Sequence, residues 1–161
     1  MRRGACIGWP GSSHVTTLAR QLIGTWRLVS REDRTAAGER RIDPGLGADP
    51  VALLVFDVAG NFAAQFMKRD RSTVEIAVTT RAGANNSTAV NGYDAYFGKY
   101  TVDEGSGSVR TTLEGSLSPE DVGSVFTREM HVDGDILTIM LATTSAAGEP
   151  VTRTLIWNRS S

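Results

Sequence analysis

The sequence is poor in the residues that build disulfides and metal sites. Its 161 residues include one cysteine, Cys6, and two histidines, His14 and His131. One cysteine cannot form an intramolecular disulfide, and two histidines with one cysteine are too few for the four ligands of a structural zinc site. We therefore expect no metal. A single cysteine suits a reducing compartment, so we expect a cytoplasmic protein.

The sequence also lacks an excess of charge of either sign and any long apolar run. Seventeen lysines and arginines stand against 18 acidic residues, for a net charge of −1. Without a basic surface the chain has no electrostatic attraction for nucleic acid. No apolar run approaches the ~20 residues that a membrane helix needs. We expect neither nucleic acid nor a membrane as partner.

Helical periodicity is scarce and is confined to the start of the chain. Residues 1–14 are basic at first and are then interrupted by glycine and proline, which predicts a flexible N-terminal extension. Val15–Ile23 has the apolar spacing of one short helix, with Ser13 as its expected N-cap. Residues 15–161 are expected to form one domain, since this length supports a single core.

Alternation of apolar and polar residues dominates the rest of the chain and predicts strands. The turn at Asp133-Gly134 favours a hairpin, because both central residues of a type I′ turn need positive φ. Eight runs show the alternation: Gly24–Arg31, Val51–Asp57, Asn61–Lys68, Tyr93–Asp103, Ser108–Leu117, Val125–Val132, Asp135–Thr143 and Val151–Arg159.

Most of these runs are joined by short turns, which predicts an all-β, eight-stranded, mainly antiparallel up-and-down barrel after a short N-terminal helix. Closure removes exposed strand edges and leaves an interior for side chains or one small ligand. A two-sheet sandwich is the alternative, but it more often has Greek-key connections. The long polar segment 69–92, with a short element expected near Val74–Thr79, is predicted to lie over one mouth of the barrel and to be more mobile than the strands.

Five segments, in order, resemble the lipocalin-like domain family of bacteria and fungi. They are LIGTWRLVS with its G-x-W, DPVALLVFDVAGNFAAQFM, YFGKYTVDEGSGSV, VDGDILTI and LIWNR, which together extend from Leu22 to Arg159. The resemblance implies a small calycin-type β-barrel with an internal cavity and no single activity. Some members are stand-alone binders, and others are suspected cyclases or isomerases of secondary metabolism.

In a closed barrel the first and last strands are neighbours, which predicts the environment of Trp26. We expect this side chain to fill the closed end against Leu155 and Trp157, with Arg153 or Arg159 over its ring. Its role is then structural.

The alternation also predicts which side chains face the interior, because charged residues in strands usually face water. Apolar residues with a few polar groups are typical of a small-ligand site. The predicted cavity residues are Leu28, Ser30, Gln65, Met67, Tyr96, Tyr100, Thr111, Arg128 and Met130.

Arg128 is the most informative of these residues. It shares the inward face with Phe126 and Met130, and a buried arginine needs an anion because it cannot lose its charge. Its partner could be Glu114 or Glu129, the ring of Trp26, or the carboxylate or enolate of a ligand.

Two functions fit these features, and a third is weaker. The first is a binding module for one small, largely apolar molecule with an acidic or carbonyl end. The second is a cofactor-independent cyclase or isomerase, for example for a cycloaddition-type ring closure in secondary metabolism, in which Arg128 and a tyrosine stabilise negative charge. The third is an interaction protein that forms a homodimer through an exposed strand face. No cofactor motif and no hydrolase triad is present, so catalytic residues remain unassigned.

Overall fold

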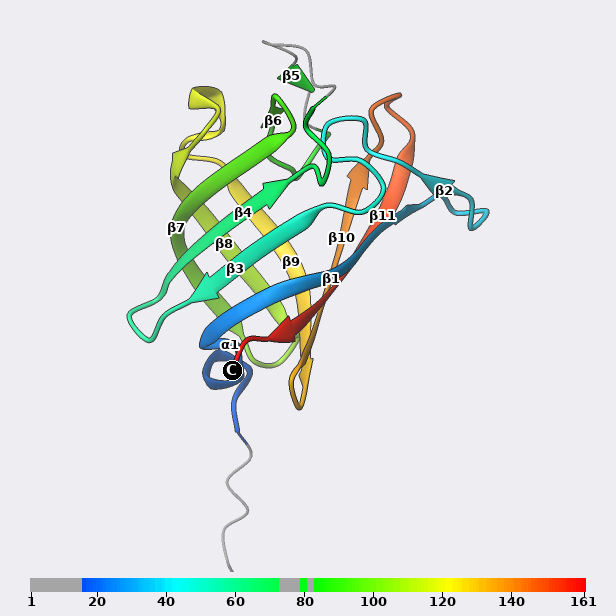
Figure 1. Cartoon of the computed structure of the whole chain (residues 1–161). Coiled ribbons are helices and arrows are strands. Elements are labelled where there is room, and N and C mark those ends of the chain that lie inside the picture. The colour runs from blue at the N-terminus through cyan, green and yellow to red at the C-terminus, as the bar shows by residue number, and fades with distance from the viewer. Residues whose placement is uncertain (1–15, 73–78, 81–82) are drawn as a thin grey trace, which may run out of the picture.

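The computed structural model describes residues 16–72, 79–80 and 83–161, which form a closed barrel (Figure 1). Its short elements are α1 (Leu18–Leu22), β2 (Arg40–Arg41), β5 (Thr79–Thr80), β6 (Ala89–Val90) and the 3-10 turn η1 (Pro119–Asp121). The barrel wall consists of β1 (Gly24–Arg34), β3 (Val51–Phe56), β4 (Asn61–Met67), β7 (Tyr93–Asp103), β8 (Ser108–Ser116), β9 (Val125–Asp133), β10 (Ile136–Thr144) and β11 (Pro150–Arg159).

All pairings between neighbouring wall strands are antiparallel. The strands follow one another from β7 to β11, β11 pairs with β1, and the pairing of β4 with β7 closes the wall. Each predicted alternating run coincides with one of these strands to within a few residues. The predicted eight-stranded barrel is confirmed.

The helix α1 is shorter than predicted and packs under one end of the barrel. Its N-cap is Thr17, whose side chain accepts a hydrogen bond from the amide of Arg20. The carboxylate of Glu104 accepts from the amides of Leu18 and Ala19 at 2.7 and 2.9 Å, which places negative charge at the helix start. Ser13 and the predicted extension 1–14 lie outside the described residues.

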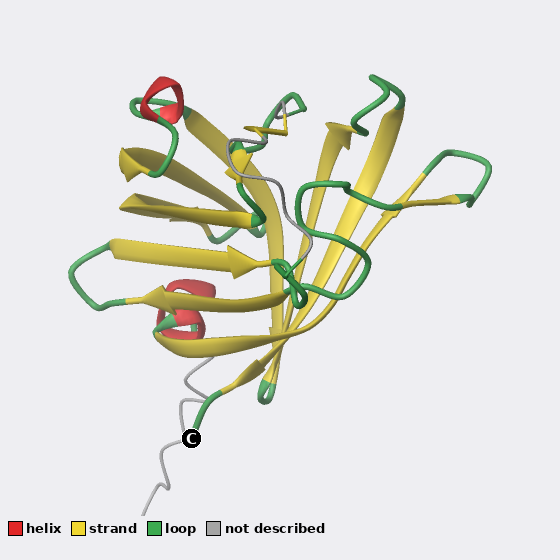
Figure 2. Ribbon diagram, turned by 45° about the horizontal axis from the view of Figure 1, so that its top comes forward, coloured by secondary structure: helices red, strands yellow, loops and turns green. Residues whose placement is uncertain are grey.

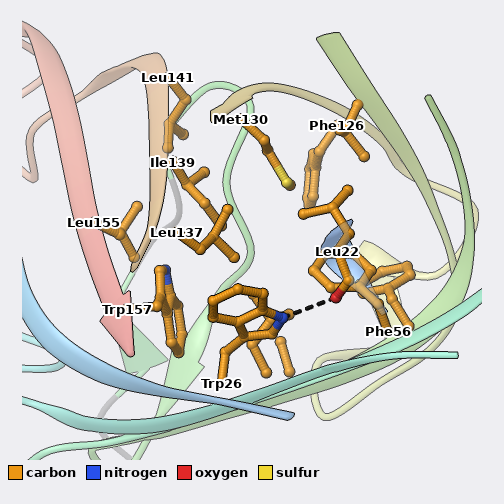
Figure 3. Packing of buried hydrophobic residues seen from close by; sticks show 14 of the residues in the cluster. Leu22, Trp26, Phe56, Phe126, Met130, Leu137, Ile139, Leu141, Leu155 and Trp157 are labelled. Atoms are coloured by element: carbon orange, nitrogen blue, oxygen red, sulfur yellow. Dashed lines mark hydrogen bonds between the residues drawn. The ribbon is translucent and has the colours of Figure 1, made fainter. Parts of the chain in front are cut away.

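Trp26 fills this closed end, as predicted (Figure 3). It is fully buried, and its Nε1 donates to the carbonyl of Leu22 at 2.8 Å. The guanidinium of Arg159 lies 4.2 Å from the centre of the indole ring and donates to two carbonyl groups near α1. Burial of the ring and the cation–π contact together tie the first strand, the last strand and the helix into one closed end.

A β-bulge in β1 determines which of its side chains face the interior. The register with β11 shifts between Leu28 and Ser30. Leu28 packs against the core, whereas beyond the bulge the buried side chains are those of Arg31 and Asp33. One extra residue reverses the faces of the strand after it, so the bulge brings two charged side chains into the barrel.

The opposite end of the barrel is open between strands and is covered by loops. β1 pairs with β3 only from Gly24 to Arg27, and farther along it pairs with β2 and β11. The strands β3 and β1 diverge there, and the loop that carries buried Leu46 crosses the gap (Figures 1 and 2). The described residues 83–90 also cross this end, on the side of β7. Of the element expected near Val74–Thr79, only Thr79, in β5, lies within the described residues.

Candidate functional site

A cavity lies inside the barrel between the closed end and residues 83–90. Its volume is about 70 Å³ for the centres of water molecules, against the ~10–15 Å³ that one water needs. The rings of Phe66 and Trp157 meet edge to face at 5.7 Å on its wall. Its apolar lining is Leu46, Leu54, Phe56, Phe62, Ala64, Phe66, Ala89, Phe126, Met130, Ile139, Leu141, Leu155 and Trp157.

The charged lining is concentrated toward the open end. Arg31 comes from the second half of β1, Asp94 from the start of β7, Arg128 from the start of β9 and Arg153 from the start of β11. In an up-and-down barrel these strand positions meet at the same end. The cavity is therefore apolar toward Trp157 and charged toward the mouth, which suits a molecule with one apolar and one polar end.

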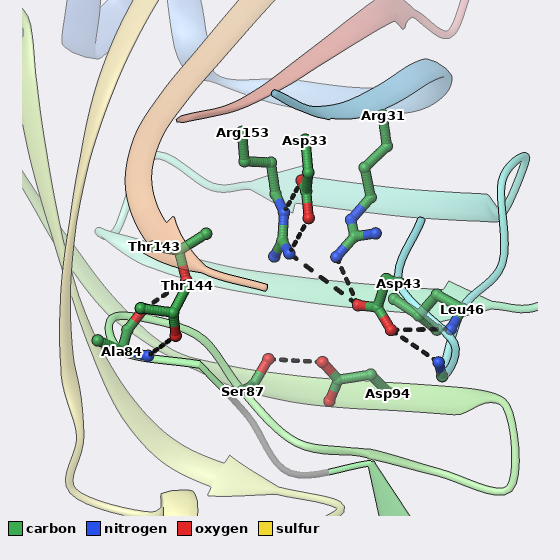
Figure 4. A network of polar contacts seen from close by, with 11 residues as sticks. Arg31, Asp33, Asp43, Leu46, Ala84, Ser87, Asp94, Thr143, Thr144 and Arg153 are labelled. Atoms are coloured by element: carbon green, nitrogen blue, oxygen red, sulfur yellow. Dashed lines mark hydrogen bonds and ion pairs between the residues drawn. The ribbon is translucent and has the colours of Figure 1, made fainter. Parts of the chain in front are cut away.

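Two of the three cavity arginines have carboxylate partners (Figure 4). Arg153 donates to both carboxylate oxygens of Asp33 at 2.7 and 2.8 Å, and Arg31 donates to Asp43 at 2.8 Å. Burial acts to raise the pKa of Asp43, but the Arg31 guanidinium outweighs it and holds that pKa below its usual range. Burial and the nearby Arg153 lower the pKa of Arg31. Within each of these two pairs the charges of the arginine and the aspartate cancel, so neither pair leaves a net charge at the mouth.

Arg128 is the third arginine, and no carboxylate among the described residues forms an ion pair with it. Its Nη1 donates to Asn85 at 2.8 Å and to the carbonyl of Thr127 at 3.2 Å, and its guanidinium lies 4.8 Å from the ring centre of Phe126. Burial lowers the pKa of Arg128 to about 10; Tyr96 opposes this and Arg153 adds to it. Among the described residues, this partly buried cation is thus held by neutral groups alone.

Asp94 is the second unusual group of the cavity. Asp94 is 4 % exposed, and its Oδ2 accepts a hydrogen bond from the hydroxyl of Ser87 at 2.5 Å. Its Oδ1 has no hydrogen-bond partner in the described part of the chain. Burial raises the pKa of Asp94 to about 6, Ser87 lowers it, and the charge of Asp121 adds to the rise. Near neutral pH this carboxyl group can hold or release a proton.

Tyr96 lies beside these two groups. Burial and the charge of Asp94 raise the pKa of its phenol to about 12, whereas Arg128 and the nearby Ser87 hydroxyl act to lower it. Its ring meets that of Phe126 edge to face at 6.5 Å. Tyr96 therefore stays protonated near neutral pH and lies close enough to the acid and the cation for both to act on its pKa.

Of the predicted site residues, four line the cavity: Tyr96, Thr111, Arg128 and Met130. Leu28 packs against the core without lining the cavity. Tyr100 points inward as predicted but lies nearer the closed end, where its ring meets that of Phe56 at 4.8 Å and its hydroxyl donates to the carbonyl of Asp57.

Ser30, Gln65 and Met67 were predicted for the cavity, and none of them lines it. The bulge after Leu28 removes Ser30 from the inner face. On β4 the buried side chains are Phe62, Ala64 and Phe66, and Gln65 instead accepts a hydrogen bond from the Tyr93 hydroxyl on the exposed face at 2.6 Å. The two phenylalanines decide the face of this strand, because burying aromatic rings stabilises the fold more than burying Gln65.

The suggested partners of Arg128 within the protein were wrong. Neither Glu114 nor Glu129 forms an ion pair with it, since both lie on exposed positions of their strands. The ring of Trp26 is occupied by Arg159.

The other charged groups of the site were not predicted for the cavity; Arg153 was expected only as one of two candidates for the ring of Trp26, and it pairs with Asp33 instead. Arg153 shares its face with Leu155 and Trp157, and Asp94 shares its face with Tyr96, so alternation contained a signal for both. Arg31 and Asp33 face inward only because of the bulge, and the positions of Asp43 and Ser87 depend on loops. Within residues 16–72, 79–80 and 83–161, no group of histidine, cysteine and acidic side chains could hold a metal ion.

The described part of the chain has no helix of the length and hydrophobicity that a membrane crossing requires. The family model of the lipocalin-like domain matches residues 23–160, from the residue before β1 to the end of the barrel. A search of curated proteins found no match.

Proposed function

We propose that this chain, which belongs to the lipocalin-like domain family, binds a small, largely apolar molecule that has an acidic or carbonyl end. The family and the closed barrel with its cavity support a ligand-binding fold in general. The character of the ligand is inferred from the distribution of side chains, which are apolar below and charged at the mouth.

The observation that carries the proposal is the state of Arg128. Arg31 and Arg153 each have a carboxylate, whereas Arg128 lines the same cavity with only neutral hydrogen-bond acceptors among the described residues. A partly buried cation without a carboxylate partner is costly, and an anionic or strongly polarised oxygen of a ligand would offset that cost. The guanidinium lies over the ring of Phe126, so such an oxygen would meet it on a side away from that ring.

Titration with matched ligands tests this proposal. We expect 3-phenylpropanoate to bind and 3-phenylpropan-1-ol, which lacks the charge, to bind at least tenfold more weakly; the fluorescence of the buried Trp157 in the cavity wall reports both. Arg128→Gln should remove most of that difference. Arg110→Gln removes a charge from an exposed position on β8 and should leave both affinities unchanged. Equal affinity for acid and alcohol would refute the proposed role of Arg128.

A cofactor-independent cyclase or isomerase would use the same cavity, with binding as its first step. Turnover of the bound molecule separates this activity from simple binding. We also propose a cytoplasmic location, supported by the single cysteine, and a place in secondary metabolism, supported by the family resemblance. A homodimer through an outer strand face stays a prediction; exposed Phe97, Leu117 and Val125 on and near β7–β9 are the side chains that such a contact would cover.

A further inference from the structure

A buried carboxyl group and a partly buried guanidinium line the same cavity, and the residues that the structure describes leave both incompletely compensated. Asp94 has one carboxylate oxygen without a hydrogen-bond partner, and Arg128 has no carboxylate. They do not pair with each other, because Asp94 is on β7 and Arg128 on β9, with β8 between them. The register places Arg128 opposite Val109 on β8 and Val109 opposite Val102 on β7, far along that strand from Asp94.

A chain of hydroxyl groups connects Asp94 to the neighbourhood of Arg128. Ser87 donates to Asp94 at 2.5 Å, and its hydroxyl lies close enough to the phenol of Tyr96 to lower the pKa of that group. The phenol of Tyr96 is close enough to Arg128 for the two to change each other's pKa. Phe126 contacts both, through its edge-to-face arrangement with Tyr96 and its position under the guanidinium.

We propose that this end of the cavity transfers protons to and from the carbon next to a ligand's carbonyl group, with Tyr96 as the contacting acid–base group, Ser87 and Asp94 as its proton relay, and Arg128 holding the carbonyl oxygen. The substrate class is an apolar, enolisable ketone, and the net reaction is an isomerisation. This inference rests on the proposed function, since the ketone must first bind at Arg128.

The step conserves atoms and electrons. The C–H bond next to the carbonyl breaks, and its proton goes to the oxygen of Tyr96 while Tyr96 passes its own proton through Ser87 to ionised Asp94. The electron pair of the C–H bond becomes the enolate, whose oxygen faces Arg128. Return of the proton from the relay to a different carbon moves a double bond and restores Asp94. No oxidant, reductant or cofactor is required.

The arrangement has a physical advantage for this chemistry. In the step, negative charge leaves Asp94, where burial opposes it, and reaches a ligand oxygen beside Arg128. An existing cation at the site of developing charge stabilises the transition state without reorganisation of solvent. A carboxyl group that titrates near neutral pH is suited to both accepting and returning a proton. The charged groups that act on Asp94 from neighbouring elements are Asp121 and Arg31.

The test uses cyclohex-3-en-1-one, an unconjugated ketone whose isomerisation to cyclohex-2-en-1-one is followed by ultraviolet absorbance. We expect the full chain to accelerate this reaction above the rate in buffer, and the rate to rise with pH through about 6 as Asp94 ionises. Asp94→Asn and Tyr96→Phe should each slow it at least tenfold while the ketone still binds. Glu129→Gln removes an exposed carboxylate from the outer face of β9 and should leave the rate unchanged.

Ketone binding is measured in the same samples, by saturation-transfer NMR, so that the two proposals fail separately. If the ketone binds and Arg128→Gln weakens that binding, but the rate stays at the buffer value, the proton-transfer inference is overturned and the binding proposal stands. If neither the ketone nor 3-phenylpropanoate binds, both are overturned. Where Asp94→Asn does not fold, the wild-type pH profile decides: a rate above background that is flat from pH 5 to 8 removes Asp94 from the relay.

Discussion

Arg153 and Asp33 face each other across β11 and β1 as a two-pronged ion pair inside the barrel. Nε and Nη2 donate to the two carboxylate oxygens at 2.7 and 2.8 Å, and both side chains are at most 5 % exposed. The two residues are also register partners in the sheet. The pair therefore fixes the first and last strands against each other at the open end, as Trp26 and Arg159 do at the closed end.

Breaking this pair on one side should destabilise the barrel more than removing it whole. Arg153→Met leaves the Asp33 carboxylate buried beside only the more distant Arg31, and we expect a loss of ~3–5 kcal/mol in the free energy of unfolding. Asp33→Leu combined with Arg153→Met should recover a large part of that loss, since apolar pairs can replace buried ion pairs. Urea unfolding of the three proteins checks this, and a double variant less stable than Arg153→Met contradicts it.

Removing the contact of Arg159 with Trp26 should lower the free energy of unfolding by less than breaking the Arg153–Asp33 pair on one side. Arg159→Ala removes a cation from the indole face and the hydrogen bonds to the carbonyl groups near α1. We expect ~0.5–2 kcal/mol from the lost cation–π contact, and Trp26→Ala should cost ~3–5 kcal/mol. Arg27→Ala, at an exposed position of the same region, is the control and should change stability by less than ~0.5 kcal/mol. Thermal unfolding orders the three variants.

Gly98 is required by a close approach of backbones at the second β-bulge of the barrel. The register of β7 with β8 shifts between Phe97 and Gly98, and a Cβ on Gly98 would lie 1.9 Å from the carbonyl oxygen of Thr112. Gly98→Ala should therefore force β7 and β8 apart and cost roughly 1–3 kcal/mol or more. Thr101→Ala, exposed on the same strand, should be nearly neutral. Equal unfolding midpoints for the two variants would show that the bulge is not under this constraint.

The raised pKa of Asp94 makes a prediction about stability and pH. Because burial raises this pKa from 3.8 to about 6, the folded chain holds the proton more tightly than the unfolded chain between those values. The contribution of Asp94 is thus most favourable below about pH 4 and is lost as pH rises to about 6, by ~3 kcal/mol. Other carboxylates, such as Asp43 with its lowered pKa, act in the opposite direction.

Comparison with Asp94→Asn isolates this contribution, since asparagine does not titrate. The difference in unfolding free energy between the variant and the wild type should shift in favour of the variant by ~3 kcal/mol from pH 4 to pH 7. A difference that stays constant over this range would mean that Asp94 titrates at its ordinary pKa in the folded protein.

The barrel could be predicted from the sequence because each wall strand is a local pattern. Alternation identifies a strand from its own residues, and short turns such as Asp133-Gly134 join it to its neighbour. Alternation also predicted correctly that Arg128 and Tyr96 face the interior, because no bulge precedes either residue on its strand. Closure also predicted an arginine over the ring of Trp26, with Arg153 and Arg159 as the two candidates, and the structure shows Arg159 there.

The rest of the site could not be predicted because it depends on irregular backbone. A single extra residue after Leu28 exchanges Ser30 for Arg31 and Asp33 on the inner face. Asp43 and Ser87 belong to loops. The length of segment 69–92 predicted that it covers one mouth of the barrel, but no pattern in the sequence indicates which loop side chains reach the cavity. Gln65 was misplaced because polarity was given more weight than the two phenylalanines on the other face of its strand.

The divergence of β1 from β3 beyond Arg27 has a consequence for protein engineering. One end of the barrel is sealed by the fully buried side chains of Trp26 and Leu22, and at the other end the loop around Leu46 fills the gap between the strands. Loop grafts across residues 43–50 could therefore enlarge or reshape the binding space while the sealed end goes on specifying the fold. Such a division makes the barrel a scaffold in which new ligand selectivity can be selected by exchanging one loop.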